Sequence, residues 1–306
     1  MISGVYANDE NFLADLSQLE NSISQVNKQI SSGIRVNQAS DDPSAVAPIL
    51  AYQGQISEIK QVQMNLNSAQ TEAQTADGAL ETASSLMDQL VSLGAEGASG
   101  TSSASARAVL GEKVQSIEQQ LVAVANTSIG ATYIFGGDSS STPPYAFSWT
   151  SPEGVIASGR PTNTATIRDT DGNEIIPRLT AQQIFDVKDS TGAPAAGNIF
   201  QAAFALGTAL LANNQPGIQS ALDQVKAGSA QLQQSTTAYG NIENWIQQAS
   251  QNATAHLNNI TQALSAIRDS DIATDATQLS IDQTALQAAL SAHASLNAKS
   301  LFSFLG

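Results

Sequence analysis

The chain contains no cysteine and few large or charged side chains. Among its 306 residues, aromatic side chains make up 5% and charged side chains 13%. The lack of cysteine excludes disulfides, iron–sulfur clusters and thiol catalysis, and it is compatible both with a reducing cytosol and with an exported, disulfide-free protein. A globular enzyme of this length usually has more large side chains to fill a thick core. Small residues at helical spacing favour thin helical bundles instead.

Basic runs and long apolar runs are also missing. The formal net charge of −15 argues against binding to a phosphate backbone, so no nucleic-acid partner is expected. No stretch is long and apolar enough to span a bilayer, so no membrane partner is expected either. The first ten residues lack a basic segment followed by an apolar one, which predicts that there is no cleavable secretory signal. Cytosolic residence is therefore the default inference.

Residue patterns of catalysis and of cofactor or metal binding are absent as well. The two histidines, His256 and His293, lie far apart in predicted helices, and no His-Glu-x-x-His, nucleophile or phosphate-loop motif occurs. The acidic run at residues 169–173 has neither the spacing of an EF-hand nor its distal Glu. We predict no catalytic residue, cofactor or metal. Because carboxylates are plentiful in the middle of the chain, an enzyme housed there stays an alternative.

What the chain does have is heptad spacing, beginning with the first helix. Apolar residues recur there in steps of four and three, while Ser, Asn and Gln fill most other positions. This seam comprises Phe12, Leu16, Leu19, Ile23, Val26 and Ile30. A seam this narrow requires a partner helix.

A much longer pattern follows Pro43. Two sets of apolar residues recur there every seven positions and form the two registers of one heptad pattern. The first set is Tyr52, Ile59, Leu66, Ala73, Leu80 and Met87, and the second is Val62, Ala69, Ala76, Ala83 and Leu90. The regularity predicts a coiled-coil helix from Pro43 to Leu93, which Gly94, Gly97 and Gly100 then break. Another helix, with Leu110, Val114, Ile117, Leu121 and Val124 on one face, is expected to fold back beside it.

The middle of the chain has a different character. Three β-branched or aromatic residues lie between glycines there and predict a strand or extended segment: Tyr133, Ile134 and Phe135. Short alternations of apolar and polar residues follow from Phe147 to about Arg178, and residues 169–173 read as a hairpin turn between two of them. We predict a small inserted β-rich domain.

Helical patterns return near Asn198, with a short helix that ends around residues 213–217. A second long seam then runs from Leu222 to Ile267. The last helix begins at about Ile272 and carries a further apolar set. This set comprises Leu279, Leu286, Leu290, Leu296, Leu301, Phe302, Phe304 and Leu305.

These patterns predict a mainly α fold. The N- and C-terminal halves form a long antiparallel helical coiled-coil bundle, and a small β-rich domain is inserted between them. The predicted divisions are 1–43 for an N-terminal assembly helix and joint, 44–136 for the N-terminal half of the helical core, 137–197 for the insert, 198–269 for the C-terminal half of the core, and 270–306 for a C-terminal assembly helix.

Two polar joints separate the terminal helices from the rest. At the first, Gly33 can adopt the left-handed conformation that ends a helix, Asp42 can accept backbone N–H bonds at the next helix start, and Pro43 fits the first helical position. The joint residues are Gly33, Arg35, Asp41, Asp42, Pro43, Arg268, Asp269 and Asp271.

The same residues carry a resemblance to a family. The run from Ser32 to Val36 followed by Asp-Asp-Pro is similar to the segment after the first helix in flagellins and their relatives. The run from Ile267 to Ala273, which lacks the usual Tyr, and the apolar ending at 301–305 also resemble that superfamily. Pro43, the Tyr-Ile-Phe-Gly-Gly run at 133–137 and the Thr-Pro-Pro run at 142–144 favour one branch of it, the hook–filament junction proteins (hook-associated protein 3).

The resemblance implies a structural subunit of the bacterial flagellum that joins hook to filament and assembles through its terminal helices. It implies a ring of identical subunits between the hook-side junction protein (hook-associated protein 1) and flagellin. It also implies a flagellar export chaperone and passage out of the cell without a cleaved signal. Three alternatives remain: flagellin itself, a cytosolic coiled-coil scaffold, and an enzyme housed in the β insert.

Overall fold

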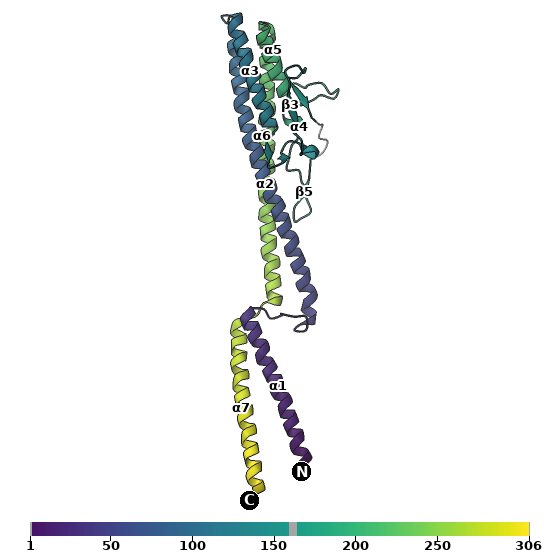
Figure 1. Ribbon diagram of the computed structural model, residues 1–306, viewed down its shortest axis with the longest axis vertical. Helices are drawn as coiled ribbons and strands as arrows, with labels where there is room; N and C mark the ends of the chain where they lie inside the picture. The colour runs from purple at the N-terminus through teal and green to yellow at the C-terminus, as the bar shows by residue number, and fades with distance from the viewer. Residues whose placement is uncertain (1, 159–163, 306) are drawn as a thin grey trace. The chain divides into compact units, whose positions relative to one another are not determined.

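A computed structural model describes residues 2–158 and 164–305, with side chains from residue 10 to residue 295. The helices are α1 (Ile2–Ser32), α2 (Pro43–Ala98), α3 (Ala104–Ala125), α4 (Ala181–Ile184), α5 (Ile199–Leu211), α6 (Gln215–Arg268) and α7 (Ile272–Leu305) (Figure 1). The chain divides into two compact units. One unit comprises residues 1–58 and 257–306, and the other is Ile59–His256.

The unit Ile59–His256 is built on α2 and α6, which run antiparallel. Gln63 donates a hydrogen bond to Thr254 over 3.2 Å, and farther along α2 the Met87 side chain lies against Gly228. Residue numbers therefore rise on one helix as they fall on the other. The structure confirms the predicted heptad seam, because the residues at most of its positions in this unit are at most 5% exposed. They are Ile59, Leu66, Ala69, Ala73, Ala76, Leu80, Ala83, Met87 and Leu90.

The predicted end of the long helix at Leu93 is wrong. Helix α2 continues through Gly94 and Gly97 to Ala98. A Cβ at Gly94 would lie 2.9 Å from Leu222 Cδ1, and one at Gly97 would collide with Leu210. These glycines therefore let α5 and α6 approach α2 closely and do not break it.

The end of α2 is satisfied by side chains from elsewhere. The buried Arg107 guanidinium on α3 donates to the Gly97 carbonyl over 2.8 Å and to the Ser99 carbonyl over 3.0 Å. Gln215 donates to the Ala98 carbonyl over 3.1 Å. Carbonyls in the last turn of a helix have no partner within the helix, and these donors supply partners at the end of α2.

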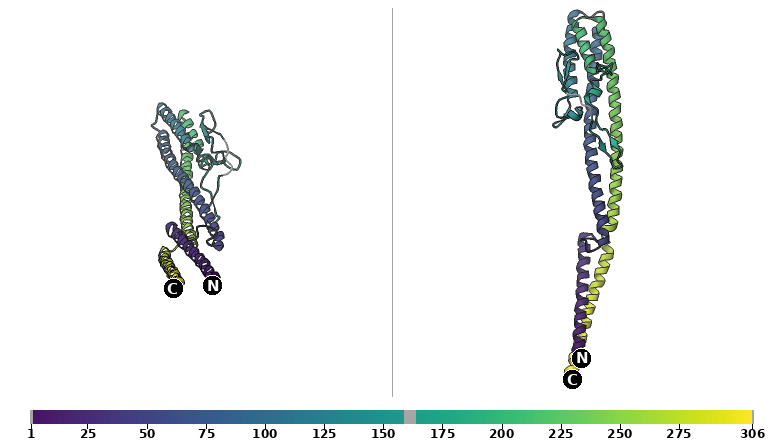
Figure 2. Two further views of the ribbon diagram at one scale, coloured as in Figure 1. Left: turned by 60° about the horizontal axis from the view of Figure 1, so that its bottom comes forward. Right: turned by 90° about the vertical axis from the view of Figure 1, so that its right-hand side faces the viewer.

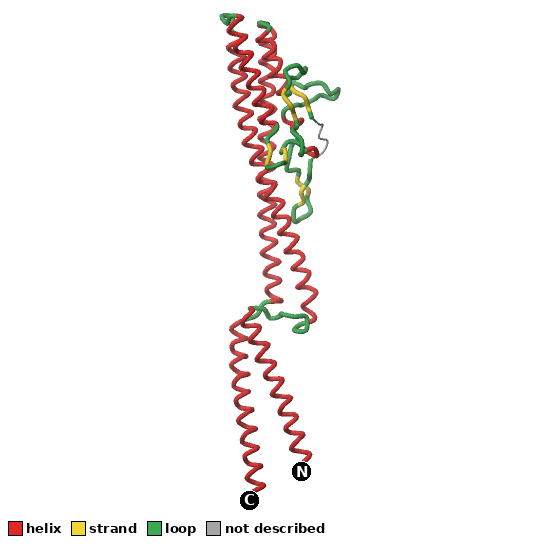
Figure 3. Tube along the Cα trace, in the orientation of Figure 1, coloured by secondary structure: helices red, strands yellow, loops and turns green. Residues whose placement is uncertain are grey.

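Between α3 and α5 lies the inserted segment, which contains three two-stranded antiparallel sheets within its described residues (Figure 3). Its strands are β1 (Ser128–Ile129), β2 (Thr132–Tyr133), β3 (Tyr145–Phe147), β4 (Val155–Ala157), β5 (Ile167–Arg168) and β6 (Glu174–Ile175). The expected hairpin is confirmed, since Ile167 pairs with Ile175 and residues 169–173 turn between them. The non-helical segment begins at Asn126, before the predicted boundary at residue 137.

The Tyr-Ile-Phe-Gly-Gly run has a core role in this unit. The strand ends at Tyr133, while Ile134 and Phe135 are buried. The Phe135 ring lies edge-on to Phe185 and to Tyr239 of α6, with centroids 5.6 and 6.5 Å apart. The predicted strand is therefore shorter, and its aromatic residue anchors the insert on the helices.

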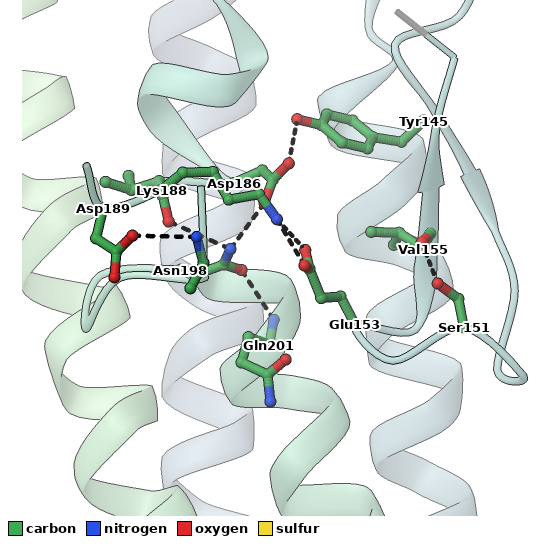
Figure 4. A network of polar contacts seen from close by, with 11 residues as sticks. Tyr145, Ser151, Glu153, Val155, Asp186, Lys188, Asp189, Asn198 and Gln201 are labelled. Carbon is green, nitrogen blue, oxygen red and sulfur yellow. Dashed lines mark hydrogen bonds and ion pairs between the residues drawn. The ribbon is translucent and has the colours of Figure 1, made fainter. Parts of the chain in front are cut away.

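A buried polar network also attaches the insert to the helices (Figure 4). Asp186 accepts hydrogen bonds from Tyr145 over 3.2 Å and from Asn198 over 2.7 Å. Lys188 lies 2.6 Å from Glu153 and 3.0 Å from Asp186. Burial opposes the charge of Lys188, but its bonds to the two carboxylates outweigh burial and raise its pKa. Asn198 also caps α5 by accepting from the Gln201 amide, so the network joins β3, the insert and α5.

Candidate functional site

The first joint ends α1 as the sequence predicts. Gly33 has φ +68°, and its amide donates to the Gln29 carbonyl over 2.8 Å. Nothing lies within 4 Å of the position that a Cβ would take there. Backbone conformation alone therefore favours glycine at this position.

The start of α2 also has the predicted cap. One Asp42 carboxylate oxygen accepts from the Ser44 amide over 3.2 Å and from the Ser44 hydroxyl over 2.6 Å. Its other oxygen lies 3.2 Å from the Arg35 guanidinium. The bonds from Ser44 and Arg35 lower the pKa of Asp42. Pro43 is the first residue of the helix, where its missing N–H leaves no gap in the helical bonding.

The two joints meet, although Arg35 and its partner Ile267 are 232 positions apart in the chain. The Arg35 and Val36 amides both donate to the Arg268 carbonyl, over 2.7 and 3.2 Å. The Arg35 side chain donates to the Ile267 carbonyl over 2.7 Å. The Ser270 amide donates to the Gly33 carbonyl over 3.0 Å. Arg35 therefore bridges the end of α6 and the start of α2.

The remaining predicted joint residues order the backbone around this contact. Asp41 accepts from the amides of Asn37 and Gln38 over 2.9 and 3.0 Å. Asp269 accepts from Ser265 and Arg268, which lower its pKa. Asp271 caps α7 by accepting from the Ala273 amide over 3.0 Å.

A small apolar cluster lies under the joint. Val36, Ala45, Ile49 and Leu264 are buried together, and Tyr52, Ile56 and Ile267 pack against them. Since these residues come from the joint itself, α2 and α6, the cluster fixes where the joint sits on the ends of those helices.

The terminal helices α1 and α7 pack antiparallel within the same unit (Figure 2, right). Phe12 stacks on His293 with ring centroids 3.9 Å apart, and Ser22 donates to Asp282 over 2.8 Å. The structure brings most of the predicted seam together here, but the pair of helices covers it only partly. Among the seam residues with described side chains, Val26 is buried, whereas Phe12, Leu16, Leu19, Ile23, Ile30, Leu279 and Leu286 are half-buried.

One predicted seam residue lies elsewhere. The Leu290 side chain is 47% exposed, and the half-buried Ala289 occupies the seam position. Steps of three and seven from Leu279 give positions 282, 286, 289 and 293, so strict heptad spacing would have found Asp282 and Ala289. The sequence reasoning followed the larger side chain and missed both. Leu296, Leu301, Phe302, Phe304 and Leu305 lie outside the described side chains.

Apolar residues also face outward on these helices. Leu13, Ile272 and Ile281 are 61%, 54% and 55% exposed. Across the part of the chain that the structure describes, no helix is sufficiently long and apolar to cross a membrane. Exposed apolar side chains beside a half-covered seam are typical of surfaces that pack against another protein.

Comparison with known proteins identifies the family. The model of the bacterial flagellin N-terminal helical region matches residues 5–139, and that of the flagellin C-terminal helical region matches residues 220–305. The chain belongs to the flagellin family. The two matches take in both joints and both terminal helices, and they leave most of the insert and α5 between them.

Curated relatives of this flagellin-family chain are distant. A flagellin of Clostridium tyrobutyricum is 27% identical over 118 residues, which is 39% of this chain and 31% of the relative. Flagellin A of Vibrio cholerae is 31% identical over 111 residues, or 36% of this chain and 29% of the relative. The chain thus matches about a third of the length of these relatives.

Solved structures share the fold over much more of their length. A protein of Vibrio parahaemolyticus assigned as flagellar hook-associated has a TM-score of 0.65 at 18% identity, covering 75% of this chain and all of that one. Flagellar hook-associated protein 3 of Legionella pneumophila has a TM-score of 0.63 at 14% identity, covering 72% and 98%. FlgL of Xanthomonas campestris has a TM-score of 0.59 at 14% identity, covering 69% and 98%.

The joint yields a direct prediction, because only the left-handed φ at Gly33 restricts the residue type there. Gly33→Val should strain the helix end by about 1–2 kcal/mol, and hydrogen exchange of residues 33–45 should become faster. Gly33→Asn should leave exchange nearly unchanged, since asparagine visits the left-handed region more readily. Mass spectrometry of the full-length chain measures both variants. Equal acceleration in the two would show that space, not backbone conformation, limits this position.

Proposed function

We propose that this chain is a structural subunit of the bacterial flagellum that joins hook to filament. The observation that carries the proposal is the half-covered seam between α1 and α7. Among its apolar residues with described side chains only Val26 is buried, so the two helices need further partners to remove the rest of that apolar surface from water.

The proposed mechanism is assembly through these terminal helices, positioned by the two joints. Neighbouring copies of the chain would complete the seam and form a ring. Hook-associated protein 1 on the hook side and flagellin on the filament side would be its other partners. We further propose that an export chaperone shields an apolar end before assembly, and that the chain is then exported from the cell.

Similarity of fold supports a role as a junction subunit over a role as a filament subunit. The three solved structures described above are flagellar hook-associated or FlgL proteins, and this chain covers 98–100% of their lengths. The flagellin relatives are covered over 31% and 29% of theirs. Flagellin remains the second candidate, because the family models that match are those of flagellin.

The two candidates differ in what the subunit must contact. A junction subunit faces unlike neighbours above and below, whereas a filament subunit contacts copies of itself. The purified chain should therefore fail to elongate into long filaments, even when seeded with its own aggregates. Electron microscopy of the seeded protein measures this. Long homopolymers would reassign the chain as flagellin.

The matched experiment in cells removes the chain. Cells lacking it should retain hooks and release flagellin monomers into the medium, because nothing would connect filament to hook. Restoring the full-length chain should restore filaments. Normal filaments in its absence would contradict the junction role.

A further inference from the structure

Helix α3 carries a fully buried carboxyl group. Glu118 is 0% exposed, and neither of its carboxyl oxygens has a hydrogen-bond partner within the described structure. Buried polar groups are normally hydrogen-bonded, and an ionised carboxylate without donors is far more unfavourable than a neutral carboxyl. The site therefore accepts Glu118 in its neutral form.

A short turn covers this carboxyl. Residues 148–154 connect β3 to β4, and we call this segment the flap. Gly154 at its end is buried with φ +72°, and a Cβ there would collide with the Glu118 carboxyl. The flap backbone thus lies directly on Glu118 and leaves no space for water between them.

Two contacts hold the flap down. The Trp149 ring packs on Phe204 of α5, with centroids 4.9 Å apart, and a Cβ at Gly207 would lie 2.6 Å from Trp149. Glu153 pairs with Lys188 over 2.6 Å (Figure 4). The base of the hairpin is fixed separately, because Asn126 bonds to both the amide and the carbonyl of Tyr145, over 3.0 and 2.7 Å.

Burial raises the pKa of Glu118 to about 8, and it is the one cause of the shift. Charged groups on the surrounding elements are engaged or point outward. Glu153 of the flap is paired with Lys188, and α5 carries no charged residue. Six charged side chains on α3, α2 and α6 are exposed: Glu112, Lys113, Glu81, Asp88, Asp223 and Lys226.

We infer that Glu118 makes the flap a pH-sensitive cover, which is closed over the neutral carboxyl and lifts off α3 when the carboxyl ionises. Opening gives the carboxylate access to water and withdraws Trp149 from α5. The Glu153–Lys188 pair opposes opening, and the bonds of Asn126 to Tyr145 keep the hairpin attached. This inference does not depend on the proposed role in the flagellum.

The direction of the effect follows from proton linkage. In the open form Glu118 has its ordinary pKa of 4.5, and in the closed form its pKa is about 8. Between these values the closed form binds more protons, so rising pH favours the open form. The ratio of open to closed flap should grow about tenfold per pH unit in this range and level off above about pH 8.

Trp149 is the natural reporter. The full-length chain contains two tryptophans, and the other, Trp245, is 59% exposed, so a Trp245→Phe background isolates the signal. Acrylamide quenching of Trp149 should increase several-fold as the pH rises from 4.5 to 8. Glu118→Gln, which keeps the neutral shape, should show low quenching throughout.

Glu112→Gln on the exposed face of α3 is the matched control and should retain the pH response. If Glu118→Gln fails to fold, as judged by circular dichroism, Glu118→Met gives the same comparison without an ionisable group. A flat response in the parent, or an equal increase in a folded Glu118 variant, would overturn the inference.

Discussion

A chain shortened to residues 45–268 is expected to remain a folded, helical monomer and to lose all assembly. Its seam in the unit Ile59–His256 is buried within the chain, so this unit does not need the termini. The α1–α7 pair, by contrast, leaves most of its seam half-exposed. Circular dichroism measures whether the shortened chain is helical, and analytical ultracentrifugation measures whether it is a monomer. Recovery of motility in cells lacking the full-length chain measures assembly. Motility restored by the shortened chain would contradict the proposed role of the termini.

The shortening also removes Val36 from the cluster under the joint. Residues 45–58 and 257–268 should therefore fray, and hydrogen exchange should be fast there but slow from 59 to 256. A point-variant pair in the full-length chain provides the matched control. Leu279→Gln changes a half-buried seam position and should reduce assembly, whereas Ser280→Gln changes the exposed neighbour and should not.

The same substitution at two glycines of α2 should change stability in opposite directions. Gly97→Ala should lower the free energy of unfolding by about 1–3 kcal/mol, because the added Cβ collides with the buried Leu210 side chain. Gly78→Ala should raise it by about 0.5–1 kcal/mol, since nothing lies within 4 Å and alanine favours a helix.

Urea unfolding of the full-length chain, followed by circular dichroism, measures both differences. Both sites lie in one helix and in one unit, Gly78 in the helix interior and Gly97 in the last turn, where the helix propensity of alanine counts for less. Only at Gly97 does the added Cβ meet another side chain, so a loss of stability there reports on packing. Equal stabilisation by the two substitutions would show that Gly97 is not a site of close helix packing.

Repeating local patterns allowed much of the fold to be predicted. The heptads of α2 and α6 specify their buried faces regardless of what covers them, and the residues at most of the predicted positions are buried. The chemistry of Gly33, Asp42 and Pro43 acts within a few residues, so the helix end and the next helix start could also be predicted. In the structure the predicted joint residues cap helices, as Asp42 and Asp271 do, or bond one joint to the other, as Arg35 does.

The sequence by itself therefore determined the helices, their seams and the two joints, because these depend on spacing and on neighbours along the chain. Tertiary structure alone decided that Arg35 bonds to the Ile267 carbonyl and that α2 continues past Gly94. It also decided that Glu118 is buried under Gly154. Glycine permits either a break or a close approach, and a glutamate at helical spacing is ordinarily exposed. Whether a glycine breaks a helix or allows close packing, and whether a glutamate is exposed or buried, depends on the segment that packs against that residue. In this chain that segment lies far away in the sequence.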